Sequence, residues 1–350
     1  MRFESLANDL TAPITVTWEV TYACNLGCAH CLSSSGKRQS NELTIEQARK
    51  MIDDMVDMGV FYINLGGGEP FARLDFIELL TYATERGLPC QFSTNGMLIT
   101  AERAKRLGEL ADIRVQVSLD GADVETNDAI RGTGSYVGAL RALDLLGREP
   151  LDELWLNSVV TRRNIDQLDD LYNIAKDKGA RLRLARMRPS GRGQASWNDL
   201  HLSLEQHAKV FEWLASHRDV TTGDSYFILN ALAALSRKDG ESWMEGFNTC
   251  GAARATCCIT PTGDVYPCAF LLGTDFNAGN VKDVPLSRMW AESPVMQMFR
   301  NTAASGECDG CPAHSHCGGG CRAVAYYERG TIVARDPECL LPMAAAMSVR

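Results

Sequence analysis

Three cysteines near the start of the chain are spaced to hold a metal cluster. Cys24, Cys28 and Cys31 form a C-x3-C-x2-C triplet, and three thiolates at this spacing can converge on one iron-sulfur cluster. Three protein ligands leave one iron of a four-iron cluster open to a substrate or cofactor, as in catalytic metal sites that keep a free position. The triplet predicts catalytic iron chemistry, with a zinc loop or three unrelated thiols as the alternatives.

A larger group of cysteines lies in the last third of the chain. Nine of the thirteen cysteines fall there: Cys250, Cys257, Cys258, Cys268, Cys308, Cys311, Cys317, Cys321 and Cys339. An odd total cannot pair completely, and the N-terminus does not read as a signal peptide, so a disulfide framework is not expected. We therefore expect these cysteines to bind metal.

Two kinds of metal site suit this spacing. The run Cys308-x2-Cys311-x5-Cys317-x3-Cys321 is typical of cluster ligands, although a tetrahedral zinc site that also uses His314 and His316 is an alternative. Cys90 stands apart on a predicted strand, where a free cysteine behaves as a small buried hydrophobe.

Composition and charge limit the possible partners. The formal net charge of -9 and the pI near 5.3 argue against sequence-independent binding of nucleic acid, which requires a basic surface. No run of about 18 apolar residues predicts a membrane span. We expect a cytoplasmic protein that binds neither nucleic acid nor membrane.

The first half of the chain predicts the scaffold that must position these residues. Short β-rich runs alternate with helical periodicity from residue 14 to about 187, as in successive βα units. Six units are fewer than the eight of a closed barrel, so we expect an open partial barrel with its site at the carboxyl ends of the strands. The predicted strands are Ile14–Trp18, Tyr62–Leu65, Gln91–Ser93, Ile113–Ser118, Leu154–Val160 and Arg181–Arg186.

The remaining boundaries follow from changes in pattern along the chain. The first helix should begin at Thr44 and end at Gly59. We expect the region after Cys250 to be rich in loops and held by metal rather than by a large core. The predicted divisions are an N-terminal extension (1–13), the partial barrel (14–200), a helical bridge (201–249) with helices near 203–216 and 224–236, and an iron-sulfur domain (250–350).

The triplet after the first strand resembles the cysteine motif of the radical S-adenosylmethionine (SAM) superfamily. That resemblance implies an α/β partial (β/α)6 barrel and one site-differentiated 4Fe-4S cluster whose open iron chelates SAM. Reductive cleavage of SAM then yields a 5'-deoxyadenosyl radical that abstracts hydrogen from the target.

The same resemblance implies which residues contact SAM. Gly66-Gly67-Gly68-Glu69 looks like the family's GGE motif for the SAM amino group, and Arg131 matches an arginine that pairs with the SAM carboxylate. The implied set is His30, Gly67, Gly68, Glu69, Asn95, Ser118, Asp120 and Arg131. Taken from the residues alone, a tight strand-to-helix connection, an ordinary Asn-Gly turn or a surface ion pair would also explain these features.

The C-terminal cysteines resemble the SPASM extension of radical SAM peptide maturases, including its G-x4-C element at Gly263 to Cys268. The resemblance implies two auxiliary clusters of the 4Fe-4S type. One would use Cys250, Cys257, Cys268 and Cys321, with Cys258 as an alternative to Cys257, and the other Cys308, Cys311, Cys317 and Cys339.

Several shorter strings are similar to the mycofactocin group of these maturases. They include Thr17-Trp18-Glu19, Cys31-Leu-Ser-Ser-Ser-Gly-Lys37-Arg38 and Arg186-Met-Arg188-Pro-Ser-Gly-Arg192. The resemblance implies oxidative decarboxylation of the C-terminal tyrosine of a short precursor peptide, and then carbon-carbon crosslinking to the preceding valine. It also implies a small peptide-binding chaperone protein and a flavodoxin- or ferredoxin-type reductant.

The residues themselves suggest a substrate contact. Arg186 and Arg188 lie at the end of the sixth predicted strand, where either could bind a substrate carboxylate, or both could belong to an ion-paired face. Competing functions are another SPASM maturase, of the sulfatase-modifying or thioether-forming kind, and a noncatalytic iron-sulfur electron carrier.

Overall fold

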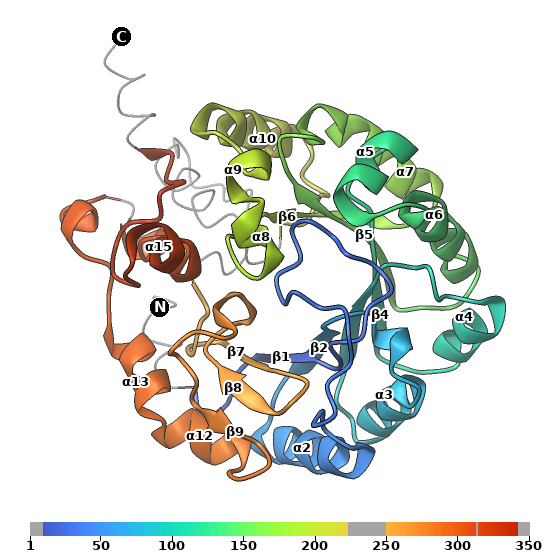
Figure 1. Ribbon diagram of the computed structural model, residues 1–350, viewed down its shortest axis with the longest axis horizontal. Helices are drawn as coiled ribbons and strands as arrows, with labels where there is room; N and C mark the ends of the chain where they lie inside the picture. The colour runs from blue at the N-terminus through green and yellow to red at the C-terminus, as the bar shows by residue number, and fades with distance from the viewer. Residues whose placement is uncertain (1–9, 223–249, 313, 342–350) are drawn as a thin grey trace.

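One nine-stranded sheet organises the computed structural model, which describes residues 10–222, 250–312 and 314–341. Six parallel strands in the order β6-β5-β4-β3-β2-β1 curve into an open barrel (Figure 1). Their bounds are β1 Thr15–Glu19, β2 Tyr62–Gly66, β3 Cys90–Thr94, β4 Ile113–Ser118, β5 Glu153–Val160 and β6 Arg181–Arg186. All six predicted strands are confirmed to within a residue or so at either end.

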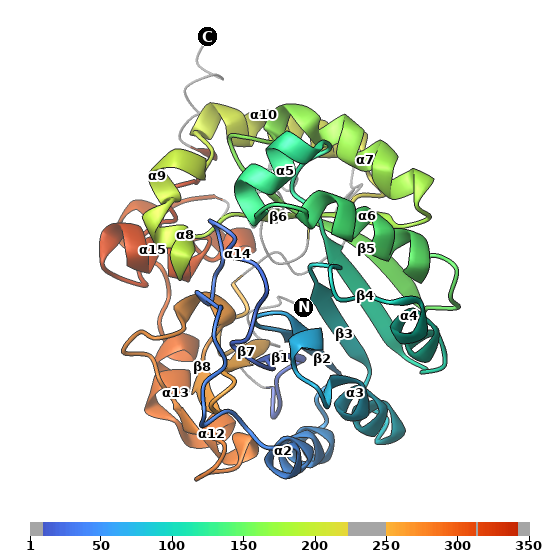
Figure 2. The ribbon, with the colours of Figure 1, turned by 45° about the vertical axis from the view of Figure 1, so that its right-hand side comes forward.

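Helices cover the outer face of this arc, as Figures 1 and 2 show from two sides. Their bounds are α2 Ile45–Met58, α3 Phe76–Glu85, α4 Ala101–Gly108, α5 Val124–Arg131, α6 Ser135–Leu146 and α7 Leu168–Asp177. Beyond β6 follow α8 Arg192–Ala195, α9 Trp197–Leu200 and α10 Leu204–Ser216. Short 3-10 turns lie at η1 Pro70–Ala72, η2 Ile165–Gln167, η3 Ala269–Leu271 and η4 Gly306–Cys308.

Helix α2 shows how local sequence sets these boundaries. The Thr44 side chain accepts from Gln47 N, and the Gln47 side chain accepts from Thr44 N, which completes a capping box. At the other end, Gly59 adopts a left-handed conformation with φ of 82°, which glycine does without a steric penalty. Both predicted ends of the helix are confirmed.

The strands of the barrel have one apolar and one polar face. On β1, Val16 and Trp18 are fully buried against the helices, whereas Thr17 and Glu19 line the interior. The interior-facing polar residues of the next five strands include Asn64, Ser93, Gln116, Asn157 and Arg183. Strands of parallel sheets usually carry apolar residues on both faces, so this polar lining indicates a binding cavity inside the barrel.

The C-terminal region continues the same sheet. β7 (Thr256–Ile259) pairs in parallel with β1, and β8 (Asp264–Tyr266) and β9 (Gly279–Asn280) extend the sheet in antiparallel fashion. The predicted boundary at residue 250 therefore does not separate two sheets.

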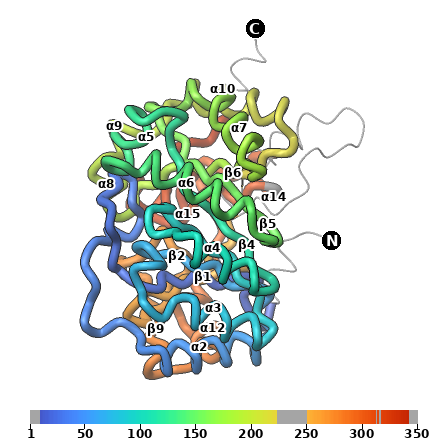
Figure 3. Tube along the Cα trace, turned by 90° about the vertical axis from the view of Figure 1, so that its right-hand side faces the viewer, coloured from blue at the N-terminus to red at the C-terminus, as the bar shows by residue number. Residues whose placement is uncertain are grey.

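Helices of this region pack on the barrel. They are α12 Leu286–Glu292, α13 Pro294–Asn301, α14 His314–Cys317 and α15 Arg322–Arg329. Figure 3 shows α12 beside α2, where Ser287 donates to Asp54. Trp290 and Phe299 are almost fully buried in the common core. The expectation that this region lacks a large core was wrong, because these residues are part of the common core. The sequence did not indicate that core, since the helices of the region are too short to show periodicity.

Of the remaining predictions, some are confirmed and one cannot be compared with the structure. Helix α10 confirms the helix expected at 203–216, whereas the helix expected at 224–236 lies outside the described residues. Cys90 is buried on β3 as predicted. In the described ranges, none of the helices combines the length and the apolar character needed to cross a bilayer.

Candidate active site

A cavity of about 300 Å³ occupies the carboxyl ends of the barrel strands. The loop after β1, which carries the cysteine triplet, crosses the mouth of the barrel in Figures 1 and 2. Most residues expected from sequence line this one cavity: Cys24, Cys28, His30, Cys31, Gly67, Gly68, Asn95, Ser118, Arg131, Arg186 and Arg188. Glu69 and Asp120 are fully buried behind its wall.

Main-chain contacts hold the cysteine loop in place. Cys24 N donates to Gly36 O at 3.0 Å, and Gly36 N donates to Tyr22 O at 2.8 Å. From α8, the Arg192 guanidinium donates to Cys28 O at 2.9 Å and to Ser35 O at 2.7 Å. One arginine, not assigned a role from sequence, thus closes the loop onto the barrel.

The three thiols share one electrostatic environment. Burial raises the pKa of Cys24 to about 11 and raises the pKa of Cys28, and in each case a negative charge on Cys31 adds to the effect. Thiolates become stable here when a cation binds them. No three His, Cys, Asp or Glu side chains of the described residues converge closely enough for a single metal ion, whereas ligands of a four-iron cluster lie on separate corners of the cluster.

The glycine turn after β2 supports the same loop. Gly68 N donates to Thr21 O at 2.7 Å, and Glu69 N donates to Ala23 O at 2.8 Å. A Cβ atom on Gly68 would lie 2.0 Å from the Ala23 carbonyl oxygen, so a larger residue does not fit. Glycine is therefore required by contact with the cysteine loop, in addition to the close ligand approach predicted from sequence.

Glu69 braces the turn from behind. Its carboxylate accepts hydrogen bonds from Thr94 Oγ1 at 2.7 Å, Asn95 N at 2.8 Å and Phe71 N at 3.3 Å. Burial raises the pKa of Glu69, which these three donors offset in part. The side chain fixes the end of β3, and the cavity wall at this point is formed by the glycines. Its assignment to the SAM amino group stays a prediction.

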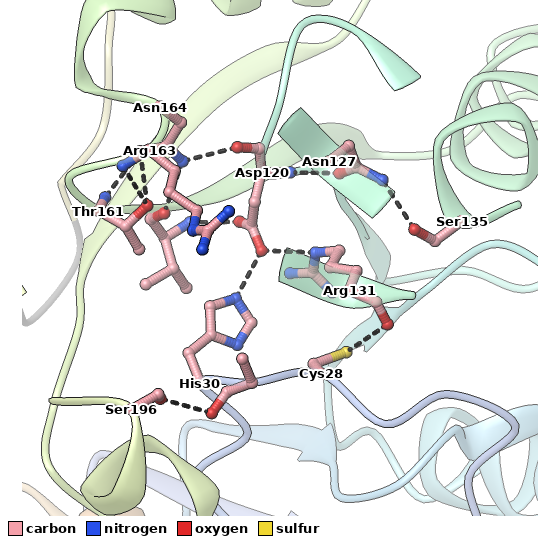
Figure 4. Close-up of polar contacts among 12 residues, drawn as sticks. Cys28, His30, Asp120, Asn127, Arg131, Ser135, Thr161, Arg163, Asn164 and Ser196 are labelled. Carbon is pink, nitrogen blue, oxygen red and sulfur yellow. Dashed lines mark hydrogen bonds and ion pairs between the residues drawn. The ribbon is translucent and has the colours of Figure 1, made fainter. Parts of the chain in front are cut away.

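Asp120 joins three parts of the cavity wall (Figure 4). Its Oδ2 lies 2.5 Å from His30 Nε2 and 2.6 Å from Arg131 Nε, and its Oδ1 accepts from Val159 N at 2.7 Å. Burial alone would raise the pKa of Asp120, but Arg131 and His30 outweigh burial and lower the pKa to about 2. An ionised Asp120 thus orients two cavity-lining side chains without lining the cavity itself.

Asn95 and Ser118 stand at neighbouring strand ends. Asn95 Nδ2 donates to Asn25 Oδ1 at 2.9 Å, and Asn95 Oδ1 accepts from Met97 N at 2.9 Å. Ser118 is the last residue of β4 and lines the cavity. Both residues line the cavity, and their assignment to SAM stays a prediction.

Arg186 and Arg188 have different surroundings. Arg186 forms ion pairs with Asp336 at 2.8 Å and with Glu338 at 2.9 Å, and Glu338 also lies 3.3 Å from His207. Arg188 stacks over Phe270, with the guanidinium carbon 4.0 Å from the ring centre. The charge of Arg186 is already compensated, which favours the ion-paired alternative for this residue.

A second cavity of about 230 Å³ lies in the C-terminal region. Its lining includes Arg186, Asp336 and the four cysteines expected to bind one auxiliary cluster, which are Cys308, Cys311, Cys317 and Cys339. Burial is the main cause that raises the pKa of Cys317, and negative charges on Cys308, Cys311 and Cys339 raise it further. Four thiols around one cavity fit an iron-sulfur cluster.

The other expected auxiliary set is only partly resolved by geometry. Burial and then the charges of Cys250 and Cys321 raise the pKa of Cys268, so these three thiols are near enough to interact electrostatically. Cys257 and Cys258 point to opposite faces of β7. The charge of Cys268 acts on Cys258, whereas Arg300 is the charged neighbour of Cys257. This arrangement favours Cys258 as the fourth ligand, and the choice stays a prediction.

Two charged cavity residues were not assigned a role from sequence. Burial raises the pKa of Glu19 to about 7, although a hydrogen bond from Ser33 acts to lower it. Arg183 donates to Gln116 Oε1 at 2.9 Å and forms no ion pair with the described residues. Their position on strands that face the barrel interior was the available signal, but the sequence does not tell which strand face is inside.

Comparison with known proteins identifies the family of this chain. Residues 18–175 match the radical SAM superfamily, and residues 250–312 match the SPASM iron-sulfur cluster-binding domain. "Mycofactocin maturase MftC" of Mycolicibacterium smegmatis is 44% identical over 339 residues, covering 96% of this chain and 85% of that protein. The chain belongs to the mycofactocin maturase family of radical SAM enzymes.

A second group of sequence matches and a set of solved structures are similar to most of this chain. "AdoMet-dependent heme synthase" of Nitratidesulfovibrio vulgaris is 32% identical over 342 residues, covering 93% of this chain and 91% of that protein. The structure of Streptococcus suis SuiB bound to precursor peptide SuiA has a TM-score of 0.78 at 20% identity, covering 96% of this chain and 78% of that chain. The expected α/β fold, a partial radical SAM barrel with a SPASM domain, is confirmed.

Membership of this family makes the chain an enzyme that uses SAM and iron-sulfur clusters. The residues fit these groups, because the three cysteines of one loop face a cavity rimmed by the glycine turn, Ser118 and Arg131. All thirteen cysteines are free of disulfides, so the eleven expected cluster ligands remain thiols.

Proposed function

We propose that the enzyme modifies the C-terminal Val-Tyr of a short precursor peptide, by oxidative decarboxylation of the tyrosine and then carbon-carbon crosslinking to the valine. One observation carries the proposal. The cysteine triplet, six of the eight implied SAM residues and the SPASM residues Cys268 and Phe270 line the same cavity, and the other two, Glu69 and Asp120, are buried behind its wall. A peptide end placed there would lie between the source of the radical and an auxiliary-cluster ligand.

Bound SAM and the triplet cluster supply the 5'-deoxyadenosyl radical. The chain's own residues position and shield it. Asp120 holds Arg131 and His30 against the cavity, and Arg192 closes the cysteine loop over the barrel. A fixed polar wall of this kind orients ligands without reorganisation and limits access of water to a reactive intermediate.

For the substrate carboxylate, we keep both Arg186 and Arg188 as candidates. Both line the cavity, where Arg188 stacks over Phe270 and Arg186 pairs with two carboxylates. Unchanged peptide turnover by an Arg186→Gln variant would remove Arg186 from this role. Turnover that falls with Arg188→Gln, mainly through a higher KM, would support Arg188.

We also propose the partners of the reaction. A small peptide-binding chaperone protein would deliver the precursor, and a flavodoxin- or ferredoxin-type protein would supply electrons. The reducing cytoplasm suits both this electron supply and the set of free thiols.

The test is anaerobic incubation of the reconstituted enzyme with SAM, reductant and a peptide ending in Val-Tyr. We expect 5'-deoxyadenosine together with a peptide that has lost carbon dioxide. Loss of two hydrogens without carbon dioxide would favour a sulfatase-modifying or thioether-forming activity instead. If no 5'-deoxyadenosine forms under any condition, an electron carrier becomes the better description.

A further inference from the structure

A buried carboxylate in the cavity has no role in the function described so far. Glu19 ends β1, is 3% exposed and lines the cavity together with Thr17, two residues earlier on the same strand face. Its Oε1 would lie 3.4 Å from a Cβ atom built on Gly66, which places the carboxylate beside the start of the glycine turn.

One oxygen of this carboxylate is left without a partner. Glu19 Oε2 is buried and accepts no hydrogen bond within the described residues. By contrast, both oxygens of Glu42 accept hydrogen bonds, from Tyr22 N, Gln39 N and Thr21 Oγ1, and both oxygens of Glu69 do so as well. Buried acceptors are rarely left unpaired in native proteins, so Oε2 is placed to receive a donor from a bound molecule.

Glu19 borders the glycine turn of the implied SAM set on one side and β7 on the other, and we assign its donor to the substrate because it lies away from the two implied SAM residues of β4 and α5. The implied SAM residues Ser118 and Arg131 lie at and beyond the end of β4, where Asp120 holds Arg131. Glu19 lies on β1 next to β7, whose Thr256 also lines the cavity. The cavity lining also includes the SPASM residues Cys268 and Phe270.

We propose that Glu19 accepts a hydrogen bond from the phenolic hydroxyl of the substrate tyrosine and so selects tyrosine over phenylalanine. This inference rests on the proposed function, in which the peptide ends in Val-Tyr. The phenol is the one side-chain donor of that dipeptide. Burial raises the pKa of Glu19 to about 7, so above neutral pH a hydroxyl bonded to its carboxylate forms a strong, charge-assisted pair. A site built for a hydroxyl rejects the analogue that lacks it.

The test measures dissociation constants of peptides ending in Val-Tyr and Val-Phe on the reconstituted enzyme, with turnover measured in parallel. We expect the wild type to bind the Val-Tyr peptide about 10- to 100-fold more tightly, the range expected for a hydrogen bond to a charged group. Glu19→Met, which keeps the length of the side chain, should abolish the preference. Glu19→Gln, which keeps a carbonyl acceptor without the charge, should retain part of it.

Thr17→Val is the matched control, because it removes a hydroxyl from the same strand face and cavity. The ratio of its dissociation constants for the Val-Tyr and Val-Phe peptides should equal that of the wild type. Iron content and SAM affinity should be unchanged in the Glu19 variants; a loss of SAM affinity with the peptide ratio preserved would overturn the proposal.

Equal binding of the two peptides by the wild type overturns the proposal without any variant. A preference that disappears in Glu19→Met supports it even if neither peptide is decarboxylated, in which case only the proposed function fails. Decarboxylation with a ratio unaffected by Glu19→Met supports the proposed function and overturns the role of Glu19.

Discussion

At the scale of single residues, Asp120 has the clearest role in positioning other side chains. It is fully buried, and its contacts to His30 and Arg131 explain why its pKa is lowered to about 2. A carboxylate whose pKa is lower in the folded than in the unfolded state stabilises the fold at neutral pH. That contribution is fully present above the unfolded-state pKa and is lost as the pH falls from there through the folded-state pKa.

We predict that Asp120→Asn lowers both stability and SAM affinity. Removing the charge leaves Arg131 buried without its partner, which typically costs about 3–5 kcal/mol. Denaturant unfolding measured between pH 7 and pH 3 should show a constant difference from the wild type down to the ordinary pKa of an aspartate, and a smaller difference below it. A variant as stable as the wild type at pH 7 would contradict this account.

The two neighbouring cysteines on β7 give a second test. If Cys258 is the fourth ligand of its auxiliary cluster, Cys258→Ser should lower iron and sulfide content and alter the electron paramagnetic resonance spectrum of that cluster. Cys257→Ser should keep both, because Cys257 faces Arg300 and the core. The reverse result would assign Cys257, as the sequence first suggested.

The sequence predicted the site residues that belong to local motifs, in which the spacing of the residues indicates their chemistry. The cysteine triplet and the glycine turn are local patterns, and each came to the cavity as expected. No spacing assigned a role to Glu19, although it belongs to a string used for the resemblance, or to Arg183, because in a curved parallel sheet the inner face is set by curvature. The partners of Arg186 lie about 150 residues away in the chain, so no local signal predicted its pairing with Asp336.

At the scale of elements, the turn after β2 is the most constrained connection at the site. Gly68 leaves no space for a side chain beside Ala23, although Gly27, within the cysteine triplet itself, has no atom within 4 Å of a Cβ position. A larger side chain would therefore clash at position 68 but not at position 27.

We predict that Gly68→Ala displaces the cysteine loop and lowers the iron bound by the triplet, with lower thermal stability. Gly27→Ala is the control and should retain wild-type iron content. Both can be measured by iron analysis and by the yield of 5'-deoxyadenosine without peptide. Normal iron content in Gly68→Ala would show that the loop tolerates the shift.

Elements were predicted well where the βα pattern repeats and poorly where elements are short. The four residues of β7 and the seven and eight residues of α12 and α13 fall below the length at which periodicity is informative. Their formation depends on contacts with β1 and α2, which are distant in sequence.

At the scale of the whole molecule, Arg186 connects the two cavities. It lines both of them and pairs with Asp336, whose carboxylate also accepts from Cys321 N at 2.8 Å. The barrel and the cysteine-rich region are thus joined by a buried charged group rather than by apolar contact alone.

We predict that Arg186→Gln destabilises the protein by about 3–5 kcal/mol, because it leaves buried carboxylates without their cation. Arg288→Gln, which breaks an exposed ion pair with Glu292, is the control and should leave the unfolding midpoint unchanged. Anaerobic denaturant unfolding followed by circular dichroism would measure both. Equal stability of the two variants would refute a structural role for Arg186.

The pairing of β7 with β1 has a consequence for how the enzyme is made. The ribosome completes β1 by residue 19, but the strand that covers its free edge begins at Thr256. During the synthesis of all residues between them, the main-chain groups of β1 on that side can pair with any other exposed strand. Nascent chains of this enzyme should therefore be prone to aggregation until the SPASM segment emerges, which favours slow expression at low temperature.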